Sequence, residues 1–289
     1  MRLRTIITLA TIILLAGEPA WLFAQGANRA HHAWGRCKVG AWKEVRQLIE
    51  TLDEKGSILN SSSMETKTTL EDVSDNDYTL RIELTVEVAG KRITKAPQVI
   101  RQGYNGESEG QKVTSKVLGK SDVTINGHTF ASEVREVVVN GGDTKRTSMV
   151  HFSDKVAPFI LKRETRSTDA EGKATNSQTQ VEVLAVDMPF NVLSEVKNAS
   201  LVKVLQKQPK TTSLTLEFHC DAVPGGVFAH TMREDDESGR TIRRGTLELI
   251  DYGTGIGDAE DDNKLGRRRL FHRNRGRNGA VPANGTRLE

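Results

Sequence analysis

The sequence predicts a mainly β protein: a large twisted antiparallel sheet or partial barrel, built from three related β-hairpin units, with little helix. Two patterns support this fold class. Apolar and polar residues alternate along the whole of 78–88, so the apolar side chains share one face of a strand. Asn126-Gly127, a pair typical of type I′ hairpin turns, separates two further strand-like runs. Strands with one apolar and one polar face favour an antiparallel sheet over a parallel sheet buried on both sides.

The N-terminus has the order of a secretory signal. Arg2 and Arg4 precede an uncharged apolar run over 5–17, and small residues follow from Ala24. This pattern predicts a signal peptide at 1–26 and an exported protein, periplasmic or extracellular after cleavage. The alternative is an uncleaved anchor that extends through Phe23, although Glu18 would then be costly inside a bilayer.

The rest of the chain is expected to comprise a lead-in at 27–41, an antiparallel β domain at 42–253 and a disordered, acidic-then-basic tail at 254–289. Two sub-domains, 42–120 and 121–253, are an alternative division of the β domain. The tail has too few apolar residues to fold alone, and its arginines predict either simple solvation or contact with an anionic surface. These arginines are Arg267, Arg268, Arg269, Arg273, Arg275 and Arg277. Aromatic residues are scarce among them and the rest of the chain is near neutral, so nucleic acid is not expected as a partner.

A recurring unit organises the β domain. Three aromatic residues are each followed six residues later by a residue that bends the chain: Trp34 by Gly40, Phe152 by Pro158, and Phe218 by Pro224. A strand-like stretch and an Asp-x-x-Gly sequence come next in each copy, in which Asp caps a turn and Gly takes its left-handed position. These turns are Asp53–Gly56, Asp169–Gly172 and Asp236–Gly239. Each unit is predicted to be strand, corner, strand, tight turn, strand, and 191–208 to be a short helix or an irregular connection.

The signal segment, the succession of strands and the chain length together resemble exported bacterial lipoprotein carriers of the LolA/LolB-like group. The resemblance implies a half-barrel that surrounds acyl chains, and hence an apolar or lipid-like ligand. It is one of architecture, so no binding residue is carried over. The carriers also pack helices into the concave face of their sheet, whereas this chain offers at most one helix.

The candidate reactive residues are few. In an oxidising compartment, Cys37 and Cys220 form a candidate disulfide, with two free buried thiols as the alternative. His219, Cys220 and Asp221, with His230, are the one place where His, Cys and a carboxylate gather. Neighbours on a strand point to opposite faces, so His219 and Cys220 do not suit one zinc ion. No metal, cofactor or catalytic set is therefore predicted, and His31-His32 is interpreted as part of a flexible linker.

These observations predict an exported, non-enzymatic binding or scaffold protein, with an apolar ligand or a packed core on the apolar face of 78–88. The alternative is an exported hydrolase that uses His230 with Cys220 or a nearby carboxylate.

Overall fold

The computed structural model describes residues 28–88, 90–141, 144–169 and 171–255. They form one antiparallel sheet and a short 3-10 turn, η3 (Arg29–His31), which confirms the predicted fold class. The strands are β1 (Trp42–Leu52), β2 (Ile58–Val73), β3 (Asp77–Val88), β4 (Lys91–Thr94), β5 (Gln98–Gly103), β6 (Lys112–Ile125), β7 (His128–Gly141), β8 (Thr144–Phe152), β9 (Ile160–Asp169), β10 (Ala174–Val192), β11 (Glu195–Lys207), β12 (Thr211–His219), β13 (Val227–Asp236) and β14 (Thr241–Gly253). Within these ranges, no helix has the length and apolar character needed to cross a membrane.

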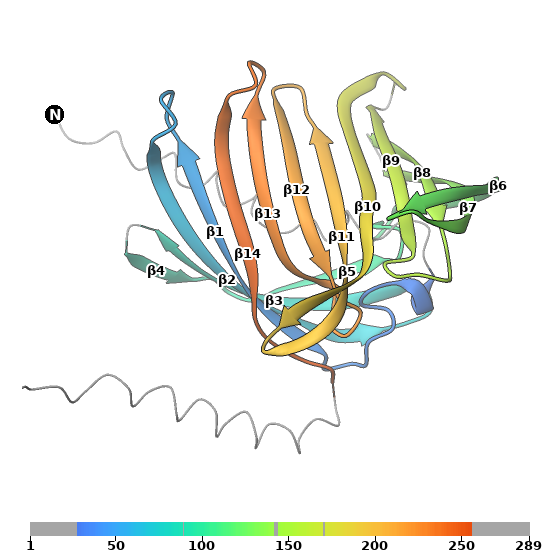
Figure 1. Cartoon of the computed structure of the whole chain (residues 1–289), viewed down its shortest axis with the longest axis horizontal. Coiled ribbons are helices and arrows are strands. Elements are labelled where there is room, and N and C mark those ends of the chain that lie inside the picture. The colour runs from blue at the N-terminus through green and yellow to red at the C-terminus, as the bar shows by residue number, and fades with distance from the viewer. Residues whose placement is uncertain (1–27, 89, 142–143, 170, 256–289) are drawn as a thin grey trace, which may run out of the picture. The chain divides into compact units, whose positions relative to one another are not determined.

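The chain enters the sheet in the middle and reaches both edges. The strand order is β4-β3-β2-β1-β14-β13-β12-β11-β10-β9-β8-β7-β6, with β5 paired to β3 beyond the end of β4 (Figure 1). Every pair in this order joins consecutive strands except β1 with β14. The chain therefore runs from β1 out to one edge, crosses to the opposite edge at β6, and returns strand by strand to β14 beside β1.

Strand β3 shows why the alternating sequence forms a sheet. Its apolar row begins against apolar residues of β2, as in the pair of Leu80 with Leu70, and both of these side chains are fully buried. Tyr78 begins the same row and is buried as well. Because directly paired residues of antiparallel strands project to the same side, this row identifies one face of the whole sheet, which we call the inner face.

The sheet curls toward its inner face. Ile125 at the end of β6 packs in one cluster with Val181 of β10 and with Val202 and Val204 of β11. Three strands, β7, β8 and β9, separate β6 from β10 in the sheet order. A flat sheet could not bring these side chains together, so the edge that ends in β6 folds back over the inner face.

The three Asp-x-x-Gly sequences form hairpin turns of the same design. In each turn the glycine N–H donates to the carbonyl oxygen of the aspartate, at 3.1, 3.1 and 2.9 Å for Gly56, Gly172 and Gly239. One oxygen of each aspartate side chain accepts the N–H of the residue four positions on, at 2.8 Å for Ser57, 2.7 Å for Lys173 and 3.1 Å for Arg240. Each glycine has a positive φ, between +79° and +82°.

Gly239→Ala is expected to lower the free energy of unfolding by about 1–2 kcal/mol. A Cβ at this position would meet no atom within 4 Å, so the cost is that of the left-handed backbone alone. Urea unfolding of purified protein measures the change. Glu237→Ala, in the same turn and exposed, should change stability by less than ~0.5 kcal/mol. Equal stability of the two variants would contradict this account of the turn.

The second and third units repeat one another with a fixed offset. β8 and β12 begin and end 67 residues apart, from 144 to 211 and from 152 to 219, and β9 and β13 keep the same offset. The register breaks at the same place in both hairpins, next to Phe152 and next to His219. Phe152 therefore corresponds to His219, and the alignment of Phe152 with Phe218 is wrong by one residue.

Two other expectations from the sequence are corrected. Trp34 lies outside any strand, so the first unit lacks its leading strand. Segment 191–208 is neither helix nor irregular: Leu193 and Ser194, with φ of 48° and 75°, form the turn into β11. They stand 67 residues after Asn126 and Gly127, which have φ of 51° and 77°. Pairing of β11 with β10 and β12 overrides the partial helical spacing.

Candidate functional site

The described part of the lead-in, residues 28–41, packs against the inner face. Trp34 is buried in a cluster with Leu70, Tyr78, Leu80 and Tyr104. The cluster joins the lead-in to the beginning of β3 and to the loop after β5. The lead-in therefore covers the first part of the apolar row on β3.

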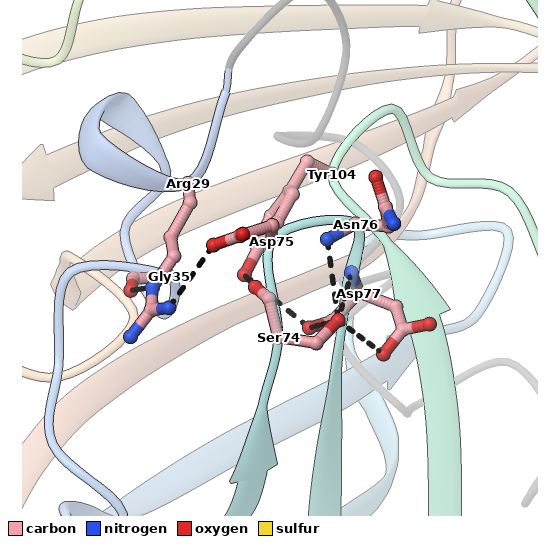
Figure 2. Close-up of polar contacts among 7 residues, drawn as sticks. All are labelled: Arg29, Gly35, Ser74, Asp75, Asn76, Asp77 and Tyr104. Atoms are coloured by element: carbon pink, nitrogen blue, oxygen red, sulfur yellow. Dashed lines mark hydrogen bonds and ion pairs between the residues drawn. The ribbon is translucent and has the colours of Figure 1, made fainter.

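Polar contacts fix this packing around the turn between β2 and β3 (Figure 2). Arg29 donates to Gly35 within the lead-in and to the Asp75 carboxylate, both at 3.3 Å. The Tyr104 hydroxyl donates to the carbonyl oxygen of Ser74 at 2.5 Å. The Ser74 hydroxyl in turn binds a carboxylate oxygen of Asp77 at 2.9 Å. These bonds hold the β2–β3 turn between the lead-in and the loop after β5.

His32 has the most strongly shifted pKa of the titratable groups in the lead-in. Its ring lies 4.7 Å from that of Tyr78 and 5.1 Å from that of Tyr104, and it is 4% exposed. Its Nδ1 accepts the N–H groups of Trp34 and Gly35, each at 3.3 Å. Burial, with a smaller contribution from the Arg36 charge, lowers the pKa of His32 to about 3. The interpretation of His31-His32 as a flexible linker is therefore wrong.

Charged and polar side chains are buried on the inner face beside the lead-in. Arg163 of β9 is 2% exposed, and Glu217 and His219 of β12 are 6% and 8% exposed. We call these three residues the inner polar cluster. His219 Nε2 lies 3.0 Å from a carboxylate oxygen of Glu217. Burial lowers the pKa of Arg163 to about 10, and the charge of Glu217 opposes that shift, so Arg163 carries a positive charge at neutral pH.

A small cavity of about 40 Å³ adjoins this cluster. Arg163 and His219 line it from the sheet, together with the apolar side chains of Ile160, Val181 and Val202. Residues of the lead-in and of the loops before β9 and β13 also line it: His31, Ala33, Pro158 and Gly225. The cavity therefore has one buried cation, Arg163, in a wall that is mainly apolar.

Of the residues proposed for hydrolysis, the structure places His230 beside a carboxylate but places Cys220 in another cluster. His230 of β13 lies directly opposite Glu217 on the inner face. Cys220 is buried in a different cluster with Val192, Val223 and Phe228. The Asp221 carboxylate binds Arg36 of the lead-in at 2.6 Å. Within the described ranges, no group of three or more His, Cys, Asp or Glu side chains is placed to hold a metal ion.

The two cysteines lie on neighbouring segments as free thiols. Cys37 is partly buried and its thiol faces the carbonyl oxygen of Ala33 at 3.3 Å, while Cys220 is fully buried. Burial raises the pKa of the Cys37 thiol, which makes it a poor nucleophile at neutral pH. The disulfide between them stays a prediction. The signal segment and the basic tail with its arginines lie outside the described residues.

Of the inner polar cluster, the sequence pointed to His219 but not to Arg163 or Glu217. Arg163 stands at an inward position of β9, between Leu161 and Thr165, which are both buried. The sequence signal that could have identified Arg163 is a charged residue at an inward position of a strand with alternating residues. This signal is weak, because the sequence of β9 alone does not show which of its two faces points inward.

No family model matches the sequence, and no curated protein matches it. Two solved structures show a distant likeness. A protein described as exported, with a YmcC-like fold, from Bacteroides fragilis NCTC 9343 is 11% identical, with 75% of this chain and 97% of the other chain covered at a TM-score of 0.30. A protein described as a lipoprotein from Parabacteroides distasonis ATCC 8503 is 9% identical, with 75% and 96% covered at a TM-score of 0.30. At this TM-score, the likenesses assign neither a fold family nor a function to this chain.

Proposed function

We propose that the protein is an exported, non-enzymatic binding protein that holds the apolar chain of a lipid-like ligand on the inner face of its sheet. One observation carries the proposal: the apolar row of β3 continues beyond the part that the lead-in covers. Tyr78 and Leu80 are 1% and 2% exposed, whereas Ile82, Leu84 and Val86 of the same row are only partly buried.

Apolar residues of neighbouring strands extend this uncovered surface. Met64 of β2 pairs with Val86, and Val86 pairs with Ile93 of β4, which is 41% exposed. We call Met64, Ile82, Leu84, Val86 and Ile93 the inner apolar band. An apolar chain laid along the band would remove these side chains from water, with a gain of about 25 cal/mol for each Å² buried.

Leu84→Lys is expected to abolish binding of a long-chain fatty acid or fatty alcohol to the purified protein. The substitution places a charge in the middle of the band, and desolvating that charge opposes burial under an apolar chain. Displacement of a fluorescent fatty acid measures the affinity. Native mass spectrometry of the wild-type protein tests whether a lipid copurifies.

Thr85→Lys is the matched control, because Thr85 is the next residue on β3 and projects from the opposite face. This variant should bind as the wild type does, and circular dichroism should show both variants folded. Absence of fatty-acid and fatty-alcohol binding by the wild type, or an equal loss in both variants, would rule out the inner apolar band as the site.

A further inference from the structure

Arg163 is a buried cation whose hydrogen-bonding capacity is incompletely used. Its side chain is 2% exposed and lines the small cavity on the inner face. Among the described residues, its buried Nε has no hydrogen-bond partner. Burying a donor of a charged group without a partner is costly, so such a group points to a ligand.

The internal repeat shows why no acid lies directly opposite Arg163 in its hairpin. In the hairpin of β12 and β13, Glu217 lies directly opposite His230. The corresponding pair in the hairpin of β8 and β9, 67 residues earlier, is Val150 opposite Arg163. A valine thus stands beside Arg163 where the other copy has a carboxylate.

The remaining charges near Arg163 are already engaged or repulsive. Glu217 is the acid that acts on it, and its carboxylate also binds His219 at 3.0 Å. Arg146 of β8 adds a second positive charge to its surroundings, itself influenced by Glu107. Arg146 also donates to the carbonyl oxygen of Gly106 at 2.9 Å.

The cavity is small. Its volume of about 40 Å³ exceeds the ~10–15 Å³ that one water needs, so a group of a few heavy atoms fits. A carboxylate has that size and accepts hydrogen bonds from a guanidinium in a planar arrangement. Apolar walls formed by Ile160, Val181 and Val202 suit the carbon atom that follows it.

We propose that this cavity is a carboxylate-binding site, with Arg163 as the group that binds the anion. The carboxylate belongs either to a small free acid or to the head group of the ligand on the inner apolar band. The second source rests on the proposed function, whereas the first does not. The lead-in touches both places, through His31 and Ala33 at the cavity and through Trp34 at the covered end of β3.

The test measures binding of sodium acetate, oleic acid and oleyl alcohol to the purified wild-type protein and to Arg163→Met. Titration calorimetry gives each affinity, and chloride keeps the ionic strength constant. Acetate binding to the wild type is expected to weaken about tenfold to hundredfold in Arg163→Met, the range of one charge-assisted hydrogen bond. Arg166→Met, an exposed position on the same strand, should bind acetate as the wild type does. Val150→Glu, which supplies an internal carboxylate opposite Arg163, should also lose acetate binding if it folds.

The probes separate this proposal from the proposed function. Oleic acid bound more tightly than oleyl alcohol, with the difference lost in Arg163→Met, supports the head-group source. Acetate binding that depends on Arg163 without such a difference supports a small free acid. Equal binding of oleic acid and oleyl alcohol with no acetate binding would overturn the carboxylate site and leave the proposed function intact. If neither oleic acid nor oleyl alcohol binds, the proposed function is ruled out. Acetate binding that depends on Arg163 would then support the carboxylate site, and its absence would overturn the site.

Discussion

Acidification is expected to destabilise the wild-type protein by about 4–5 kcal/mol more than it destabilises His32→Asn. The pKa of His32 is about 3 in the folded protein and near 6.5 in the unfolded chain. The folded pKa is the lower one, so the contribution of His32 to stability is fully present above pH 6.5 and is lost as the pH falls toward 3. In this window the unfolded chain takes up a proton that the folded protein does not bind, at up to about 1.4 kcal/mol for each pH unit.

Asparagine is the appropriate replacement because its side-chain oxygen can accept the N–H groups of Trp34 and Gly35 in place of Nδ1, yet it does not titrate. Urea unfolding from pH 7 to pH 3.5 gives both stability curves. Carboxylates titrate in the two proteins alike, so the difference between the curves isolates His32. Parallel curves would show that His32 is accessible to protons in the folded protein, and the packing of the lead-in described here would be incorrect.

Glu217→Gln is expected to lower the free energy of unfolding by about 3–5 kcal/mol in acetate-free buffer. The amide still accepts a hydrogen bond from His219, but the negative charge that acts on buried Arg163 is gone. An uncompensated buried charge costs this amount, whereas replacing both charges by uncharged groups is often neutral or stabilising. Adding Arg163→Met to Glu217→Gln should therefore restore most of the lost stability.

Urea unfolding of the wild type, both single variants and the double variant forms a complete double-mutant cycle. Glu248→Gln is the control, because that carboxylate is exposed and pairs with exposed Arg46 on the sheet surface. Its effect should stay below ~1 kcal/mol. Additive effects of Glu217→Gln and Arg163→Met would show that the two charges do not interact, and the inner polar cluster would lose its electrostatic basis.

Some features of the molecule follow from local sequence. Alternation over 78–88 predicts a strand with one apolar face, because side chains of a strand project to opposite sides in turn. Asn126-Gly127 forms a two-residue turn because both residues tolerate positive φ. The turns at Asp53, Asp169 and Asp236 combine a capping carboxylate with a left-handed glycine, and both requirements are visible within five residues.

Other features depend on contacts between distant segments. Leu193 and Ser194 form the same kind of turn as Asn126 and Gly127 although neither residue favours it, because the paired strands β10 and β11 impose the backbone conformation. The correspondence of Phe152 with His219 rests on strand register, which a sequence comparison led by aromatic residues misplaced by one position.

The sequence by itself determined that this chain forms antiparallel strands and where several of them turn, since those choices depend on residues a few positions apart. The tertiary structure alone decided that His32 and Trp34 of the lead-in are buried and that Arg163 and Glu217 share the inner face beside one cavity. Arg163 and Glu217 come from β9 and β12, which two further strands separate in the sheet. Only the pairing and curl of the sheet bring such charges together, because their interaction depends on distance in space and on burial.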